Sequence, residues 1–319
     1  MSKVVNFVLV GAGDIAKTHI TAINSIKEAN LIGILSLTSL TRAKKLAAQY
    51  KIKAYKNYLS VLKDNKVEAV DIISRNDMHA KLGIKAANYG KHILVEKPLA
   101  TNLKDAGKLV NACRDKKVKL SIMFQNRFAG IYQKMKKDIY RNRFGKINLV
   151  KLSWCFNKNN NYFLSSSWRK SKKQAGGGLL IMNIIHYIDL LLWFFGPVVS
   201  VVGRTKNCKF KNIEVEDTVW AVMKFKNDVE AIIYSTITAC VSTPPSLKIY
   251  GTKANFIFED DQYLIADEKL FAKQIENFAQ AIQNNKKPLI DGEEGLKSLE
   301  VVLKIYQSSK LNREIKSFF

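Results

Sequence analysis

The first 125 residues alternate short apolar runs with amphipathic stretches, and this alternation restricts the fold more than any other feature of the chain. Apolar runs bounded by turn residues are typical of buried strands, and apolar residues at helical spacing are typical of surface helices. The strand-like runs lie at residues 5–13, 30–37, 67–74, 91–98 and 119–128, and the helix-like stretches lie at residues 14–26, 41–50, 79–90 and 102–118. Strand–helix alternation over this length predicts a parallel, doubly wound α/β sheet.

After about Phe128 the pattern changes to consecutive strand-like runs joined by turn residues. Such runs are typical of a mostly antiparallel sheet. They lie at residues 146–156, 198–206, 218–227, 229–239, 246–253 and 254–260, with helix-like stretches at residues 130–145, 176–196, 269–285 and 293–310. A chain of 319 residues suits two domains, and we expect them over residues 1–125 and 126–319.

The chain carries 52 Lys and Arg residues against 27 Asp and Glu residues, which gives a net charge of +25. A strongly basic protein can bind nucleic acid, and a basic surface also attracts phosphorylated substrates. Here the lysines are spread along the chain, without a long basic block or a nucleic-acid-binding motif. We therefore expect solvated lysine-rich faces and no nucleic-acid partner.

The cysteines and the apolar segments indicate a reduced, cytoplasmic protein. Four cysteines are widely spaced and form neither a CxxC pair nor a zinc pattern. The apolar start runs directly into a glycine turn without a cleavage site, so we expect no signal peptide. The long apolar run over residues 176–202 is broken by Asn183, His186, Asp189 and Pro197, which favours a buried helix followed by a strand over a membrane span.

The segment GAGDIA follows the first predicted strand and opens the first predicted helix, as a dinucleotide-binding turn requires. Gly11 would allow the tight turn, Gly13 would let the backbone approach a pyrophosphate, and Ala16 would permit close helix–strand packing. An ordinary glycine-rich turn is the alternative. The cofactor contacts predicted here are Gly11, Ala12, Gly13, Asp14 and Ile15.

The end of the second predicted strand indicates which nicotinamide cofactor is preferred. NAD-binding sites place an acidic residue there for the ribose hydroxyls. This chain has Ser36 and Thr38 instead, and Arg42 follows, which suits a 2′-phosphate. We expect NADP(H) or NAD(H), with NADP(H) slightly favoured.

Lys97 ends a strand of the alternating series and precedes Pro98. Ligands bind at the carboxyl edge of such a sheet. A lysine there can orient a substrate hydroxyl or accept its proton if burial lowers the lysine pKa. The alternative is a solvated lysine at a strand end.

These motifs resemble, in order and over nearly the whole chain, the Gfo/Idh/MocA family of sugar and polyol dehydrogenases. The segments that carry the resemblance are GAGDIA, SRNDMHAKLGIKAANYGKHILVEKPLA, NRF and WRKSKKQAGGG with the later His186. The resemblance implies a Rossmann dinucleotide-binding domain and a second α+β domain with a large, mostly antiparallel open sheet for substrate binding and oligomerisation. It implies hydride transfer between a nicotinamide cofactor and a secondary alcohol or ketone carbon of a sugar.

The resemblance also implies roles for individual residues. Catalysis is expected of Lys97 and His186, and substrate binding of these two residues with Asn126, Arg127 and Asn183. Further cofactor contacts are expected from Ser74, Arg75, Asn76, His79, Glu96, Lys97, Trp168 and Arg169. Many members have proline where Arg75 stands, so Arg75 would alter the cofactor rim.

Two further features bear on the substrate. Many members carry an aspartate four residues before the helix histidine, where this chain has Met182 followed by Asn183. The segment NIEVEDTVWAVMKF, residues 212–225, resembles members that act on UDP-linked N-acetylhexosamines. Its alternative reading is a solvated acidic turn before a strand. A free sugar, an inositol or another polyol stays open as the substrate.

The helix predicted over residues 176–196 contains Asn183, His186 and Asp189 within an otherwise apolar run. On an α-helix Asn183 and His186 would share one face, and Asp189 would either hold the imidazole or meet solvent. His186 lacks neighbours at metal-ligand spacing, so we predict no metal site. A non-catalytic NADP(H)-binding regulator is the alternative to a dehydrogenase. The open sheet predicts a homodimer or homotetramer.

Overall fold

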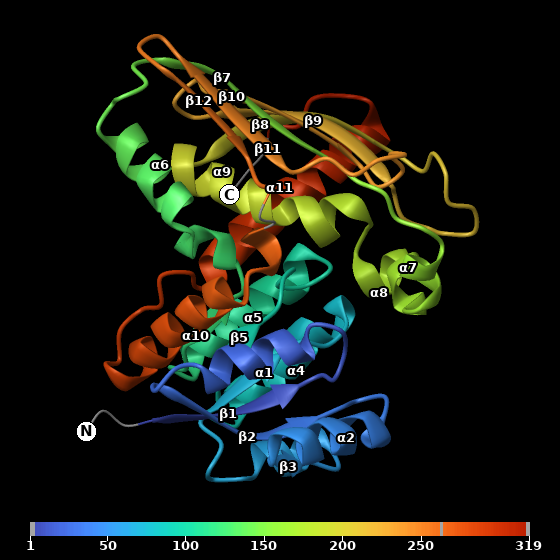
Figure 1. Ribbon diagram of the computed structural model, residues 1–319, viewed down its shortest axis with the longest axis vertical. Coiled ribbons are helices and arrows are strands. Elements are labelled where there is room, and N and C mark those ends of the chain that lie inside the picture. Colours follow the sequence, from blue (N-terminus) through green and yellow to red (C-terminus); the bar gives the residue numbers. More distant parts are fainter. Residues whose placement is uncertain (1–3, 262–263, 317–319) are drawn as a thin grey trace. The chain divides into compact units, whose positions relative to one another are not determined.

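The computed structural model describes residues 4–261 and 264–316 and separates into two compact units (Figure 1). The first unit comprises Met1–Gln125 and Asp267–Leu296, and the second comprises Asn126–Ala266 and Lys297–Phe319. The sequence predicted one division, at residue 125, with all later residues in the second domain. In the structure the segment Asp267–Leu296 groups with the first unit instead.

The first unit contains a six-stranded, wholly parallel sheet in the order β3-β2-β1-β4-β5-β6. Its strands are β1 (Val5–Val10), β2 (Ala29–Leu35), β3 (Lys53–Ala54), β4 (Ala69–Ile72), β5 (His92–Val95) and β6 (Leu120–Ile122). Its helices are α1 (Ala16–Asn24), α2 (Leu40–Tyr50), α3 (Tyr58–Leu62), α4 (Asn76–Asn88), α5 (Leu103–Asp115) and α10 (Glu268–Gln283). The strand order is that of a Rossmann fold, so the fold class predicted for this part is confirmed.

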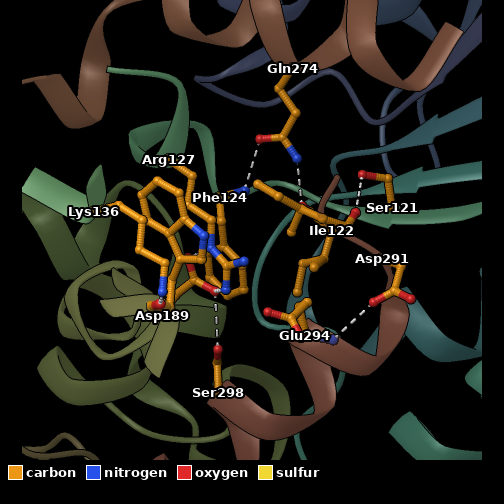
Figure 2. Close-up of polar contacts among 12 residues, drawn as sticks. Ser121, Ile122, Phe124, Arg127, Lys136, Asp189, Gln274, Asp291, Glu294 and Ser298 are labelled. Atoms are coloured by element: carbon orange, nitrogen blue, oxygen red, sulfur yellow. Dashed lines mark hydrogen bonds and ion pairs between the residues drawn. The ribbon is translucent and has the colours of Figure 1, made fainter. Parts of the chain in front are cut away.

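Helix α10 belongs to the core of the first unit although it lies far along the chain. Its apolar face, with Phe271, Ile275 and Phe278, packs into the same cluster as β1, β2 and α1. Figure 2 shows how Gln274 fastens α10 to the end of β6. The Gln274 amide donates to the Ile122 carbonyl at 2.7 Å and accepts the Phe124 N–H at 3.0 Å. Both amide atoms are buried and hydrogen-bonded, so these bonds, together with the burial of the apolar face, fix the position of the helix.

The second unit contains a six-stranded sheet in the order β12-β11-β7-β10-β9-β8. Only β10 and β7 pair in parallel, and the other pairs are antiparallel. Its strands are β7 (Ile147–Cys155), β8 (Val198–Lys206), β9 (Thr218–Phe225), β10 (Glu230–Thr236), β11 (Ser246–Gly251) and β12 (Asn255–Glu259). Its helices are α6 (Gly130–Tyr140), α7 (Asn161–Leu164), α8 (Lys172–Ala175), α9 (Ile185–Phe195) and α11 (Gly292–Leu311), of which residues 297–311 belong to this unit.

Helices cover one face of the second sheet, as Figure 1 shows for α9 and α11. Phe195 of α9 stacks edge-on against Phe225 of β9, and Ile305 of α11 lies against Gly203 of β8. Burial alternates along β9 and β10, so every second side chain points away from these helices. The mostly antiparallel sheet with one open face, predicted from the consecutive strands, is confirmed.

Among the described residues, one helical segment, Lys172–Phe195, is long and apolar enough to cross a membrane. Its apolar window is 78% buried inside the structure, as in a core helix. This agrees with the prediction of a buried helix followed by a strand.

Candidate active site

The glycine turn joins β1 to α1 in a conformation that depends on its glycines. Gly11 has φ of 141°, and a Cβ there would lie 2.6 Å from the Ile73 side chain. A Cβ on Gly13 would instead meet nothing within 4 Å. Helix α1 begins at the fully buried Ala16 without a side-chain cap. An uncapped helix start beside open space fits a phosphate, whose oxygens would accept the first N–H groups.

The end of β2 brings Arg42 back to the glycine turn. Ser36 accepts the Ser39 N–H, and Ser39 caps α2 by accepting the Arg42 N–H at 3.3 Å. The Arg42 guanidinium reaches the Ala12 carbonyl of the turn at 3.5 Å. Thr38 is exposed in the same loop. Ser36, Thr38 and Arg42 therefore form a polar, cationic rim next to the turn.

The loop after β4 carries Ser74 and Arg75, and the first turn of α4 carries Asn76 and His79. Arg75 pairs with Asp77, with an Nε–Oδ1 distance of 3.2 Å, and keeps about a third of its side chain exposed, at 37%. Ser74 is half-buried beside it, and Asn76 is buried as the first residue of α4. Arg75 thus forms a positively charged edge of the loop that is partly neutralised by Asp77.

His79 is a buried link in the scaffold. Its Nδ1 lies 2.7 Å from the Pro98 carbonyl and its Nε2 lies 2.9 Å from the Ser74 carbonyl. Burial lowers the pKa of His79, while the two carbonyl contacts oppose that shift. Both ring nitrogens face protein carbonyls, so His79 holds the Ser74 loop to the Pro98 turn. These two contacts give His79 a positioning role, and its contact with the cofactor stays a proposal.

Lys97 lies just beyond the carboxyl end of β5, joined to Pro98 by a cis peptide bond. Its backbone N–H donates to Glu96 Oε2 at 3.1 Å. Both Glu96 and Lys97 are partly exposed. The predicted pair thus stands at the sheet edge where ligands bind in this fold.

A buried histidine that was not predicted from the sequence lies next to Glu96. His19 of α1 is fully buried between Asp71 of β4, at 2.7 Å, and Glu96, at 3.1 Å. Burial lowers the pKa of His19, but the charge and hydrogen bond of Asp71, together with Glu96, outweigh it and raise the pKa to about 10. The available signal was a histidine one turn into the helix that follows a dinucleotide-binding turn.

In the second unit, the glycine triplet brings the chain close to the Tyr306 side chain and to the Glu216 backbone. Gly176 ends α8 in the left-handed region, with φ of 85°. A Cβ on Gly177 would lie 2.1 Å from the Tyr306 hydroxyl, and one on Gly178 would lie 1.9 Å from the Glu216 carbonyl oxygen. Only glycine permits both approaches.

Glu216 holds the start of the helical segment that carries His186. Its carboxylate accepts the N–H groups of Gly178 at 2.8 Å and Leu180 at 2.9 Å, and the Tyr306 hydroxyl at 2.7 Å. Burial raises the pKa of Glu216, and these donors act in the opposite direction. The neighbouring Asp217 is also fully buried and accepts the N–H groups of Cys208 and Lys209. The reading of this segment as a solvated acidic turn is therefore wrong for Glu216 and Asp217.

Asn183 and His186 lie on two different kinds of helix. Leu180–Ile184 forms the π-helical turn η3, and α9 begins at Ile185. The α-helical spacing rule therefore does not apply to this pair, because only His186 lies in α9. His186 is buried, at 4% exposure, and Asn183 is half-buried. Single π-helical turns are frequent at functional sites.

Asp189 binds Arg127 and does not face solvent, as Figure 2 shows for the pair. Arg127 Nε lies 2.7 Å from one carboxylate oxygen and Nη2 lies 2.6 Å from the other. Ser298 donates to the same carboxylate at 3.3 Å. Arg127 is 2% exposed and Asp189 is fully buried. This bidentate ion pair engages the guanidinium of Arg127, for which the family resemblance implies substrate binding. Arg127 therefore anchors η1 (Gln125–Phe128) to α9.

Trp168 and Arg169 lie in the turn η2 (Ser167–Lys170), where the Arg169 guanidinium lies over the rings of Trp168 and Tyr162. A cavity of about 10 Å³, enough for roughly one water, contains Arg169 in its wall. Its lining residues are Tyr162, Phe163, Arg169, Gly178, Leu179, Met182, Asn183 and Ile237. The structure thus brings Arg169, Met182 and Asn183 together within the second unit.

Asn126, a predicted substrate contact, belongs to the second unit. Asn126 is 1% exposed, and its amide makes no hydrogen bond within the described part of the chain. A cavity of about 230 Å³ is bordered by Lys172, Glu216 and Tyr306, and none of the predicted site residues lines it. No cluster of three or more His, Cys, Asp or Glu side chains suited to a metal ion occurs among residues 4–261 and 264–316.

Comparisons with known proteins agree with this geometry. Residues 5–124 match an oxidoreductase family with an NAD-binding Rossmann fold, and residues 132–257 match the GFO/IDH/MocA C-terminal domain. The chain is similar to the WlbA dehydrogenase of Bordetella pertussis, solved in complex with NADH and UDP-GlcNAcA. The identity is 27%, the TM-score is 0.92, and the match covers 100% of this chain and 99% of that one.

Two further relatives show the same relationship. The WlbA dehydrogenase of Chromobacterium violaceum, solved with the same two ligands, is 26% identical with a TM-score of 0.90, over 99% of this chain and 96% of that one. The myo-inositol 2-dehydrogenase of Thermotoga maritima is 22% identical over 97% of both chains. The two matched segments cover most of the chain and agree with the Rossmann order and with the Glu96–Lys97 strand end. The chain belongs to the Gfo/Idh/MocA family of NAD-binding oxidoreductases.

Proposed function

We propose that this protein is an NAD(P)-dependent dehydrogenase of a sugar nucleotide, and that its substrate is a UDP-N-acetylhexosamine derivative. The observation that carries the proposal is the full-length likeness to two dehydrogenases solved with UDP-GlcNAcA, at 27% and 26% identity. The basic composition also suits an anionic ligand.

The nucleotide half of the proposed site uses the first unit. Gly13, the uncapped start of α1 and Arg42 fit the pyrophosphate and the adenosine ribose. The proposed cofactor contacts are Gly11, Ala12, Gly13, Asp14, Ile15, Ser36, Thr38, Arg42, Ser74, Arg75, Asn76, His79, Glu96 and Lys97. Trp168 and Arg169 are proposed as cofactor or substrate contacts from the second unit.

The bound nicotinamide supplies the hydride acceptor or donor, and the protein supplies orientation and proton transfer. We propose Lys97 and His186 as the two groups that serve the substrate hydroxyl: one takes its proton and the other orients it. General-base catalysis contributes about 10²–10⁴-fold. Asn126 and Asn183 are proposed substrate contacts, because each is a neutral amide with donors and acceptors for hydroxyls. Lys97 and His186 belong to different units, so their joint action rests on family membership.

The cofactor preference proposed is NADP(H) over NAD(H). Ser36 follows β2 where NAD-specific sites carry a carboxylate, and Arg42, near the start of α2, reaches the glycine turn. Titration of the purified protein with NADPH and NADH, followed by fluorescence, tests it. Tighter NADPH binding that is lost in Arg42→Ala supports the preference. Tighter NADH binding in the wild type contradicts it.

The substrate is tested by absorbance at 340 nm with the purified protein and a panel of UDP-GlcNAcA, UDP-GlcNAc, myo-inositol and free hexoses. Turnover confined to the UDP-linked sugars supports the proposal. Turnover of myo-inositol alone would make the protein a polyol dehydrogenase, as the Thermotoga maritima relative is named. Cofactor binding without turnover of any of these compounds would favour a regulatory role.

The proposed assembly is a cytoplasmic homodimer or homotetramer that associates through the open face of the second sheet. That face carries the exposed side chains of Trp220 on β9 and of Tyr234 and Ile232 on β10, with Trp220 opposite Tyr234 and the half-buried Val222 opposite Ile232. Exposed apolar patches of this kind are typical of interfaces. All four cysteines are free thiols, which suits a reducing compartment.

A further inference from the structure

Three charged side chains connect the helix of the glycine turn to the strand end that carries Lys97. His19 lies on α1, Asp71 on β4, and Glu96 directly after β5. The His19 Nδ1 is 2.7 Å from Asp71 Oδ2, and its Nε2 is 3.1 Å from Glu96 Oε1. His19 and Asp71 are fully shielded from solvent, and the Glu96 side chain is 12% exposed.

The two carboxylates define the protonation state of the ring. Burial raises the pKa of Asp71, and the charge and hydrogen bond of His19 act in the opposite direction. Two ionised carboxylates only accept hydrogen bonds, so an imidazole between them donates from both nitrogens. A ring that donates twice is an imidazolium. The ring of Phe271 of α10 also meets His19 edge-on, with centroids 5.2 Å apart. The charges of Asp71 and Glu96 favour the protonated ring.

Glu96 contacts both the His19 ring and the backbone of Lys97. One carboxylate oxygen faces the His19 ring, and the other accepts the backbone N–H of Lys97 at 3.1 Å. A carboxylate held at both oxygens has a fixed orientation. The position of the Lys97 backbone is thus tied through Glu96 to a residue of α1.

We propose that His19 is a positioning residue whose imidazolium, anchored by Asp71, fixes Glu96 and thereby the backbone from which Lys97 acts. This inference rests on the catalytic role proposed for Lys97. Helix α1 then has two roles. Its start faces the proposed phosphate site, and its His19 positions the strand end that carries Lys97.

The kinetic test compares His19→Gln, Glu96→Gln and the double variant with Ser121→Ala as a matched control. Ser121 is buried in the same unit and donates to the Ile290 carbonyl at 2.6 Å, away from the triad. Misplacement of a reacting group by about 1 Å can lower a rate about 100-fold. We expect kcat to fall by about 10- to 100-fold in each single variant, with little further loss in the double variant. In His19→Gln, which leaves every proposed cofactor contact in place, the Kd for the cofactor should change less than about threefold, and Ser121→Ala should keep its kcat.

A second readout does not use turnover. With ¹⁵N-labelled histidine, nuclear magnetic resonance should show His19 doubly protonated near pH 8.5, and Glu96→Gln should lower its pKa. If His19→Gln does not fold, Glu96→Gln alone carries both readouts.

The outcomes separate this inference from the proposed function. A neutral His19 ring at pH 7, or full kcat in Glu96→Gln, would overturn the positioning role. Lys97→Ala is measured in the same assay. If it loses turnover while His19→Gln keeps it, only the positioning role is wrong. If Lys97→Ala itself keeps full turnover, the role proposed for Lys97 is wrong.

Discussion

Buried carboxylates organise both units of this protein at the scale of single residues. Asp71 binds a histidine, Asp189 binds an arginine, and Glu216 binds backbone N–H groups and a tyrosine hydroxyl. Each is nearly or fully buried, so each carboxylate is expensive to leave without its donors. Their partners lie between 36 and 90 residues away along the chain. Local sequence patterns extend over fewer residues than this, so they do not predict these partners.

The pH dependence of stability follows from His19. Its pKa is raised from 6.5 to about 10 in the folded protein, so folding strengthens its proton binding. The stability that His19 contributes is fully present below about pH 6.5 and is lost as the pH rises toward 10. We expect the free energy of unfolding to fall between these values, by at most about 1.4 kcal/mol per pH unit from this group. Urea unfolding at several pH values should show a smaller fall in His19→Gln, and equal falls would contradict the assignment.

At the scale of elements, the segment from Gly176 to Gly196 shows what periodicity can and cannot predict. Its apolar character correctly predicted a buried helix. The division into a π-helical turn, Leu180–Ile184, and α9 was not predicted. The start of this segment is held by Glu216 and Tyr306, which lie on later elements. Glycine stands at 177 and 178 because larger residues would collide with the Tyr306 hydroxyl and with the Glu216 backbone.

Replacing Gly178 with alanine tests this account of the triplet. The added Cβ would lie 1.9 Å from the Glu216 carbonyl oxygen, so the backbone must shift. We expect a loss of about 1–3 kcal/mol in the free energy of unfolding, measured with urea. Gly130→Ala is the matched control in the same unit, because its Cβ would meet nothing within 4 Å in helix α6. It should be neutral or stabilising by up to about 1 kcal/mol, and equal losses in both variants would refute the steric explanation.

At the scale of the whole molecule, the sequence predicted the architecture better than the contacts of the site. Strand–helix alternation and the consecutive later strands were sufficient for the two sheets. They were not sufficient to assign α10 to the first unit, because amphipathic spacing reports that a helix has an apolar face and not which sheet receives it. The predicted site residues remain proposals. Two of them have protein partners that the sequence did not predict: His79 contacts the Pro98 carbonyl, and Arg127 binds the Asp189 carboxylate.

The open sheet face makes a prediction about assembly. We expect the native mass to be a multiple of 36.1 kDa, measured by light scattering after gel filtration. Trp220→Glu with Ile232→Lys should lower that mass, because two charges would enter the proposed interface. Val241→Glu is the control, since Val241 is 75% exposed but lies outside the strands. A wild-type protein that runs as a monomer would contradict the proposed assembly.

The central claim is that Lys97 acts in hydride transfer to or from a sugar nucleotide. The most direct measurement is the single-turnover change in absorbance at 340 nm when wild type and Lys97→Ala, each saturated with oxidised cofactor, are mixed with UDP-GlcNAcA. We predict a rise at 340 nm in the wild type and a rate at least about 100-fold lower in Lys97→Ala, with cofactor affinity retained. Equal rates in the two proteins, or no change at 340 nm with any sugar nucleotide in the wild type, would contradict the account.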